Sequence, residues 1–450
     1  MLRKNQYDFF ALYPKLFSWC IVQHTHKMAG GLMQLVAYGA QDVYLTGNPK
    51  VTFFQAVYRR HTNFAMENIE QTVNGTAADS GRVSVTIARN GDLVGDMYVE
   101  LKAANLATTA LNGGAISNEW VAERAIKDVE LSVGGQRIDK HYQKWWRLYS
   151  ELYLDSAKKT TWGKMTTGDD SQVFLPLIFF FNRNPGLALP LIALQYHEVR
   201  LDFDLSSEFS QYTDNTTFKV YANYIYLDTE ERRRFAQKGH EYLIEQVQHT
   251  GQDTLAAATQ TKQIRLSYNH PVKELVFCAS ESSVSNCAVW NFTKNQAAIA
   301  TTAGGAALQS GSDSLIDLDA GNCPKLLVGD GAGATSTSFD EETVGTIENM
   351  KLVLNGQDRF KEQSGKYFNQ VQPYQHHSGT PMPGIYSYSF ALKPEEHQPT
   401  GTCNFSRIDN AQVSIKTALG NSGQLQLNMF AVNYNVLRIQ SGMGGLAFSN

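Results

Sequence analysis

The segment Ile126–Arg137, with the sequence IKDVELSVGGQR, is repeated later in the chain as Ile347–Asp358, with the sequence IENMKLVLNGQD. The two copies share an isoleucine, a leucine and a Gly-Gln pair at an offset of 221 residues (347 − 126). A second pair, Asn223–Leu227 (NYIYL) and Asn433–Leu437 (NYNVL), repeats at an offset of 210 residues (433 − 223). Because the two offsets differ only by the length of a loop, the sequence predicts one domain of about 200 residues duplicated in tandem.

The duplication favours a building block over a catalyst, and the composition indicates a β-rich, weakly charged protein with extensive protein contacts. The chain has 450 residues, more than a single hydrophobic core usually organises, which agrees with two domains. Charged residues make up only 18%, and 23 Phe, 21 Tyr and 35 Gly favour pleated, turn-rich structure. The net charge is −4, and the basic cluster Arg232–Arg234 directly follows Glu230 and Glu231, so direct binding of nucleic acid is not expected.

Both halves contain short runs of β-branched and aromatic residues separated by turn residues, which is typical of a β-sandwich. The predicted strands are Val51–Tyr58, Arg82–Ala88, Met97–Leu101, Val129–Val133, Val173–Phe181, Tyr196–Leu205 and Phe218–Leu227 in the first half, and Gln263–Tyr268, Val272–Cys278, Met350–Leu354, Ile385–Leu392, Gln412–Lys416 and Leu425–Leu437 in the second. The sequence therefore predicts an all-β protein.

Helix is expected mainly at His141–Leu154, where apolar residues recur with the helical period. The stripe comprises Trp145, Leu148, Tyr149 and Leu152. We expect it to pack on the edge of a sheet. The aromatic segments Tyr142–Tyr153 and Phe174–Phe181 are candidates for domain cores or for a seam between domains.

The domain limits follow from changes in composition. Residues Asp228–His240 are charged and lack periodicity, which indicates a linker and places the boundary near Gly239. The predicted domains are residues 28–238 and 239–450. Residues 295–343, rich in Ala, Gly, Ser and Thr, are predicted to form a long exposed insert in the second domain.

Residues 1–27 form an N-terminal extension of a different character. Its aromatic run Phe9–Val22 is broken by Pro14 and Lys15 and is far shorter than the ~20 apolar residues that a bilayer requires. No small-residue cleavage site of a secretory signal precedes Lys27. We interpret the extension either as lying upstream of a true start at Met28 or as a peripheral arm.

No catalytic, cofactor-binding or metal-binding residues are predicted. His197 and His240 are each followed by glutamate, as in zinc hydrolases, but both lack the second histidine one helical turn later. His376 and His377 are adjacent, so their side chains are expected to project in different directions and to chelate poorly. The five cysteines lack metal-site spacing and are expected to be reduced thiols: Cys20, Cys278, Cys287, Cys323 and Cys403.

Four Asn-x-Ser/Thr sequons are candidate glycosylation sites: Asn74, Asn215, Asn291 and Asn404. They matter only if the chain meets a glycosylation machinery. Asn404 lies close to a predicted strand, where a glycan would fit badly.

Long runs in a fixed order along residues 28–450 carry a resemblance to a known family. They are MAGGL (Met28–Leu32), QLVAYGAQDVYLTGNP (Gln34–Pro49), VYRRHTNFAMENI (Val57–Ile69), GGQRIDKHY (Gly134–Tyr142), NPGLALPLIALQYHEV (Asn184–Val199), NHPVKEL (Asn269–Leu275), LNGQDRF (Leu354–Phe360), GTCNFSRIDNA (Gly401–Ala411) and NYNVLRIQSGMGGLAF (Asn433–Phe448). Together they resemble the major capsid protein of nucleocytoplasmic large DNA viruses, the group that includes iridoviruses and phycodnaviruses. Residues 1–27 and 295–343 fall outside this pattern.

The resemblance implies a double jelly roll: two eight-stranded sandwiches in tandem, with a few short helices in loops. It also implies a structural, non-enzymatic role in the virion, in which homotrimeric capsomers of pseudo-hexagonal outline tile an icosahedral shell assembled in the host cytoplasm. The implied partners are the chain itself, neighbouring capsomers, and minor capsid and penton proteins. Residues 28–48 are expected at the capsomer base, near proteins of an internal membrane, and the insert 295–343 is expected to face outward.

Two other functions remain open from the residues alone. A carbohydrate-binding jelly-roll module is supported by abundant Tyr and Trp and by exposed loops. A cupin-type metalloenzyme would need several His and Glu ligands converging from strands. The carbohydrate-binding module differs from a capsid subunit because it need not form a tight trimer. The metalloenzyme differs because it would contain a metal ion.

Overall fold

The structure is a computed structural model, and it describes residues 30–106, 110–111, 114–115, 120–256, 260–281, 292, 315–318, 324–327, 345–418 and 424–448. The chain divides into two compact units, Met1–His61 and Thr62–Asn450, which are described separately. The extension 1–27, most of the insert 295–343 and the candidate glycosylation site Asn291 lie outside the described residues. Within the insert, β16 (Leu315–Leu318) pairs with β17 (Pro324–Leu327).

In its described residues, 30–61, the first unit contains two short helices, α2 (Gly30–Val36) and α3 (Val43–Thr46). The strand predicted at Val51–Tyr58 is wrong, because these residues form only turns and irregular backbone. Phe53 and Phe54 in this run are more than 90% exposed. A run of strand-forming residues needs a neighbouring strand and a surface to pack on, and these residues have neither among the described residues 30–61.

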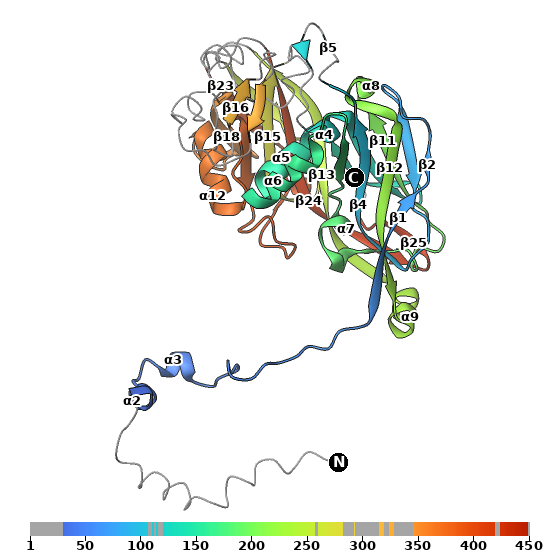
Figure 1. Cartoon of the computed structure of the whole chain (residues 1–450). Helices are drawn as coiled ribbons and strands as arrows, with labels where there is room; N and C mark the ends of the chain where they lie inside the picture. Colours follow the sequence, from blue (N-terminus) through green and yellow to red (C-terminus); the bar gives the residue numbers. More distant parts are fainter. Residues whose placement is uncertain are drawn as a thin grey trace, which may run out of the picture. The chain divides into compact units, whose positions relative to one another are not determined.

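The second unit begins with a sandwich of two antiparallel sheets (Figure 1). The first sheet has the order β1 (Phe64–Gln71), β12 (Thr213–Leu227), β4 (Leu93–Ala103) and β10 (Leu189–Pro190), and β9 (Gln172–Pro176) also pairs with β4. The facing sheet has the order β2 (Val73–Asn74), β3 (Arg82–Thr86), β11 (Val199–Leu205), β7 (Ile126–Val133) and β8 (Gln136–Tyr142).

A second sandwich follows with the same strand order. One sheet has the order β13 (His240–Leu255), β24 (Leu425–Gln440), β15 (Pro271–Glu281) and β21 (Ile385–Ser389), and is extended by β22 (Cys403–Asn404) and β25 (Met443–Leu446). The facing sheet has the order β14 (Thr261–Arg265), β23 (Ala411–Thr417), β18 (Ile347–Leu354) and β19 (Gln357–Asp358), with β20 (Gln363–Ser364) paired to β18. The shared order of the main strands confirms the predicted tandem duplication of a β-sandwich.

The repeated sequence lies in equivalent hairpins. Its copies form β7–β8 and β18–β19, and each hairpin turns through two residues with positive φ, Gly134-Gly135 and Asn355-Gly356. A two-residue turn of this kind matches the twist of the strands and requires glycine or asparagine, which explains the shared glycine. The second repeat lies in the equivalent central strands β12 and β24.

Helices occupy the connections between strands. The predicted helix is confirmed as α5 (Gln143–Tyr153), and α6 (Ser156–Thr166), which was not predicted, follows it with Asp155 capping the backbone N–H of Lys158 at 2.8 Å. The shorter helices of the unit are α4 (Val121–Ala125), α7 (Phe180–Arg183), η1 (Pro185–Leu187), α8 (Phe209–Tyr212), η3 (Tyr367–Val371), α12 (Gln372–His376) and η4 (Phe405–Arg407). No helix of the described residues is long and apolar enough to cross a membrane.

The segment predicted as a linker contains a helix. Residues Thr229–Gln237 form α9, and no residue of this helix is buried. Glu230 and Glu231 lie in its first turn and Arg234 in its last, a distribution that favours the helix dipole. Because α9 has no apolar stripe, hydrophobic periodicity gives no signal for it.

Candidate functional site

The histidines singled out by their sequence context make structural contacts. His197 Nδ1 lies 2.9 Å from the carbonyl oxygen of Gly444, and His240 Nε2 lies 2.8 Å from that of Phe235. In the part of the chain that the structure describes, no three His, Cys, Asp or Glu side chains are grouped so as to hold a metal ion.

The two described cysteines are free thiols. Cys278 is fully buried and Cys403 is partly exposed, whereas Cys20, Cys287 and Cys323 lie outside the described residues. Burial raises the pKa of the Cys278 thiol to about 11, although the nearby Lys144 lowers it. A buried, protonated thiol is a poor nucleophile, so Cys278 acts as a packing residue.

The two sandwiches meet along a buried seam, which is the contact of β8, α5, α6 and α7 with β13, β24 and β15 and with residues 377–382. At its centre the ring of Phe430 in β24 lies 5.6 Å from that of Trp145 and 6.0 Å from that of Tyr142. Lys144 Nζ donates a hydrogen bond of 3.0 Å to Ser280 Oγ across the same contact. The prediction that Tyr142–Tyr153 packs at a core or seam is confirmed.

Strand alternation explains how one sheet serves two cores. In β15, Leu275 and Phe277 point into the core of the second sandwich, whereas Val276 and Cys278 pack into the core cluster that the first sandwich shares with the seam. All four side chains are at most 2% exposed. A strand buried on both faces reads as a continuous apolar run, and residues 275–279 (LVFCA) have this pattern.

A buried ionic cluster lies where the helices of the first sandwich join. Arg147 of α5 lies 3.7 Å from Glu123 of α4 and 3.3 Å from Glu151, and Lys159 of α6 pairs with the other oxygen of Glu151. The indole N–H of Trp162 donates to Glu123 at 2.5 Å. Burial raises the pKa of Glu123, and the charge of Arg147 opposes that shift. Two carboxylates and two cations balance in a site that water does not reach.

The same ionic cluster forms hydrogen bonds with the loop of residues 379–382 in the second sandwich. Lys159 Nζ donates to the carbonyl of Thr380 at 3.0 Å, and the backbone N–H of Met382 donates to Glu151 Oε2 at 3.3 Å. The backbone N–H of Gly379 donates to the carbonyl of Leu152 at 2.9 Å. A Cβ at Gly379 would lie 2.4 Å from the carbonyl oxygen of Glu151, so only glycine permits this approach.

A second ionic group crosses the seam from α7. Arg183 pairs with Glu245 of β13 at 2.8 Å, and Lys273 of β15 pairs with the other oxygen of Glu245 at 2.7 Å. Burial raises the pKa of Glu245, but Arg183 and Lys273 outweigh it, so the net shift is downward. Lys273 Nζ also donates to the carbonyl of Pro394 at 2.6 Å.

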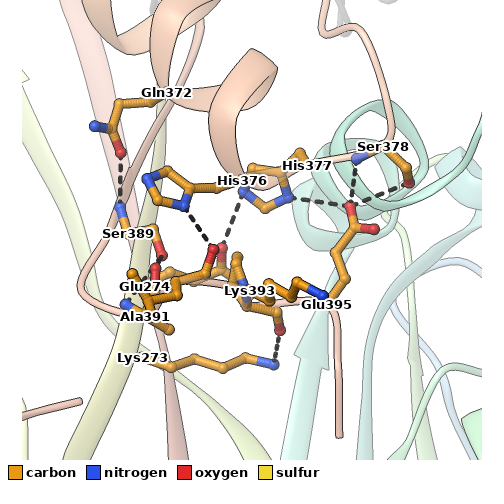
Figure 2. Close-up of polar contacts among 12 residues, drawn as sticks. Lys273, Glu274, Gln372, His376, His377, Ser378, Ser389, Ala391, Lys393 and Glu395 are labelled. Atoms are coloured by element: carbon orange, nitrogen blue, oxygen red, sulfur yellow. Dashed lines mark hydrogen bonds and ion pairs between the residues drawn. The ribbon is translucent and has the colours of Figure 1, made fainter. Parts of the chain in front are cut away.

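His377 sits between two carboxylates in the same region (Figure 2). Its Nε2 lies 3.1 Å from Glu274 of β15 and its Nδ1 lies 3.3 Å from Glu395. Burial lowers the pKa of His377, but the two glutamates raise it more, to about 9. The adjacent His376 points to a different partner, the carbonyl of Leu392 at 3.0 Å, as expected for neighbouring residues that cannot chelate together.

A cavity of about 400 Å³ lies beside these groups. Its lining includes Tyr149, Tyr153, Phe180, Arg183, Asn184, Pro185, Leu187, Glu245, Glu395 and His397. The charged groups Arg183, Glu245 and Glu395 on its wall pair with one another or with His377. These ion pairs link the two sandwiches. Among the described residues that line this cavity, no nucleophile is paired with a base.

Three of the four candidate glycosylation sites lie among the residues that the structure describes. Asn74 in β2 and Asn215 near the start of β12 are exposed. Asn404 in β22 is also exposed, and its side-chain oxygen accepts a hydrogen bond of 3.0 Å from the backbone N–H of Ser406. Asn291 is among the residues that the structure does not describe.

Sequence reasoning did not predict the ionic groups of the seam. Glu123, Glu151 and Lys159 are at most 2% exposed, yet in the sequence they read as ordinary charged residues of helices.

Comparison with known proteins agrees with this architecture. Residues 52–228 match a family model described as major capsid protein N-terminus, and residues 231–445 match one described as large eukaryotic DNA virus major capsid protein. The major capsid proteins of Paramecium bursaria Chlorella virus 1 and of Phaeocystis pouchetii virus are 46% and 40% identical to this chain, and each comparison covers 94% of this chain and 100% of the relative.

Solved structures show the same fold. A chain of the structure titled "PBCV-1 virus capsid, quasi-atomic model" superposes with a TM-score of 0.72 at 39% identity, covering 89% of this chain and 100% of that one. The Faustovirus major capsid protein, at 12% identity and a TM-score of 0.64, covers 91% and 96% and shares the fold. The chain therefore belongs to the family of major capsid proteins of large eukaryotic DNA viruses, and its two sandwiches form the double jelly roll of that family.

Proposed function

We propose that three copies of this chain form a homotrimeric capsomer of pseudo-hexagonal outline, and that such capsomers tile the icosahedral shell. The observation that carries the proposal is the seam, which joins two sandwiches of identical strand order through buried aromatic and ionic contacts. Three rigid chains then present six similar sandwiches around one axis. Closed rings of this kind satisfy every contact surface without leaving an open end.

The subunit acts by geometry and carries no catalysis of its own. The buried charged groups of the seam pair with one another, and no pair of them is placed as nucleophile and base. Interfaces between capsomers would be weaker than those within the trimer, because many modest contacts summed over a shell stabilise it while letting misplaced capsomers dissociate.

We place the domain limits at residues 28–238 and 239–450, since α9 separates the last strand of the first sandwich from the first strand of the second. The insert 295–343 faces outward, and residues 28–48 contact minor capsid and penton proteins close to an internal membrane. Assembly takes place in the host cytoplasm. Asn74, Asn215 and Asn404 are exposed and accept glycans where the host supplies them, and Asn291 remains a sequence-based candidate.

Light scattering combined with electron microscopy of the purified full-length chain tests the proposed assembly. We expect a mass three times the 50.1 kDa of one chain, and particles with three-fold symmetry and a hexagonal outline. A protein that stays monomeric at concentrations far above those of assembly would contradict it.

Limited proteolysis of intact particles tests the proposed orientation. We expect the first cuts within residues 295–343. Preferential cleavage near Met28, with the insert protected, would overturn the orientation while leaving the trimer intact.

A further inference from the structure

The helices of the first sandwich that form the intrachain seam have topological equivalents in the second sandwich. In the first sandwich, α5 and α6 lie in the chain between the β7–β8 hairpin and β9. In the second sandwich, η3 and α12 lie between the β18–β19 hairpin and β21. Both β9 and β21 pair with the equivalent central strands β4 and β15, so the two helical segments are topological equivalents.

These equivalent helices differ in what they touch. Helix α5 covers the outer face of the sheet formed by β13, β24 and β15, through Trp145 and Phe430. Helix α12 lies beside the second sandwich, whereas α5 and α6 lie between the two sandwiches (Figure 1). Around α12, three apolar side chains are open to solvent: Tyr374 is 89% exposed, Leu392 74% and Val371 40%.

In the described residues of the second unit, the outer face of the equivalent sheet of the first sandwich stays partly open to solvent. Its neighbours Val99, Val220 and Leu175 are fully buried, so Tyr98, Tyr221 and Phe174 point away from the core by strand alternation. The rings of Tyr98 and Tyr221 stack at 5.2 Å, and Phe174 meets Tyr98 edge to face at 5.9 Å. All three are partly exposed.

Charged residues surround this aromatic group on the same face. Lys219 lies opposite Glu100 in the register of β12 and β4, and Glu70 accepts from the hydroxyl of Tyr221 at 3.3 Å. A polar rim around partly exposed aromatic side chains is typical of a reversible protein interface.

We propose that the α12 surface (Val371, Tyr374 and Leu392) of one copy covers the outer face of β1, β12, β4 and β9 (Tyr98, Phe174, Tyr221 and Lys219) of the next copy. This inference rests on the proposed trimer and names the surfaces that form it. This contact between two chains has the same arrangement as the contact that α5 makes within one chain. It is head-to-tail, and three such contacts close a ring in which each sandwich covers its neighbour.

Substitution of Tyr374 tests the α12 side of this interface. Tyr374→Glu places a charge at the centre of the contact and, at a position so exposed, leaves the fold of the chain intact. We expect the trimer to weaken by about 30-fold or more, as for a central aromatic residue of an interface. Tyr196→Glu is the matched control, because Tyr196 is a 75% exposed aromatic residue outside both surfaces. Circular dichroism and thermal unfolding verify that both variants are folded.

Cross-linking tests the pairing of the two surfaces. The double variant Tyr374→Cys/Lys219→Cys, treated with a flexible bifunctional maleimide, should give covalent trimers on a denaturing gel. Each single variant, like the wild type, should stay monomeric on the gel, which also controls for the native cysteines.

The outcomes separate this inference from the function on which it rests. A wild-type trimer that persists in Tyr374→Glu, with no covalent trimer from the double variant, would overturn the interface and leave the capsomer proposal standing. A wild-type chain that is monomeric by light scattering would overturn both.

Discussion

The outer faces of the two equivalent sheets have the same strand order but different chemistry. On the second sandwich this face carries Phe430, Val276 and Cys278, which are buried under the first sandwich. On the first sandwich it carries Tyr98, Tyr221 and Lys219, which stay partly exposed. One face is a permanent part of the folded chain, and the other has the aromatic and charged character of a contact that forms after folding.

The difference shows what duplication preserved and what it changed. The inner faces kept their alternating apolar pattern, because every copy of the sandwich needs a core. The outer faces were free to diverge, since their chemistry depends on which neighbour covers them. Substitutions on the two faces should therefore differ in the free energy of unfolding and in their effect on assembly.

The largest expected effect comes from the buried ionic cluster of Glu123, Arg147, Glu151 and Lys159. Glu151→Ala leaves Arg147 and Lys159 buried without their shared carboxylate, which should lower the free energy of unfolding by about 4 kcal/mol. Chemical denaturation followed by tryptophan fluorescence measures it. Glu396→Ala, which removes an exposed carboxylate 2.8 Å from Lys393, is the control and should change stability by about 0.5 kcal/mol or less. Equal effects would mean that the cluster is not buried as described.

Removal of the central aromatic residue of the seam should have the next largest effect. Phe430→Ala should cost about 3 kcal/mol, because it opens a cavity among Tyr142, Trp145 and His249. Tyr221→Ala, at the equivalent open face, should cost about 1 kcal/mol in the monomer while weakening the trimer. The comparison fails if Tyr221→Ala destabilises the monomer as much as Phe430→Ala does.

His377 should contribute to the pH dependence of stability. Its pKa is raised from 6.5 to about 9 in the folded protein, so its contribution is fully present below pH 6.5 and is lost as the pH rises to about 9. The whole window corresponds to at most about 3 kcal/mol. Thermal unfolding between pH 6 and pH 9.5 should show this loss in the wild type and a flatter profile in His377→Gln. Identical slopes in the two proteins would exclude His377 as the source.

The smallest effect is expected in the repeated hairpins. Gly135 and Gly356 have φ values of +82° and +79°, and a Cβ at either position meets nothing within 4 Å. Gly135→Ala and Gly356→Ala should therefore each cost about 1 kcal/mol, from backbone strain alone. Thermal unfolding of the two variants would detect an unequal cost, which would show that the two turns are not equivalent.

The sequence was most informative where structure depends on neighbours along the chain. Strands such as β7, β23 and most of β24 were predicted because their apolar residues alternate or run continuously. Strand β13 was missed although it has 16 residues, because its polar positions, such as Glu245 and Gln246, are buried against the first sandwich. Helix α9 within the predicted linker was not predicted, because no face of it is apolar.

The sequence by itself determined that the chain is a duplicated β-sandwich, because strand alternation and two-residue turns are local properties repeated at a fixed spacing. Only the tertiary structure decided how the copies are joined. Glu151 and Lys159 lie in consecutive helices, but Thr380 comes from the second sandwich, and a buried charge is stable only when its partners are brought beside it. That pairing depends on the packing of the whole chain and leaves no periodic trace in the sequence.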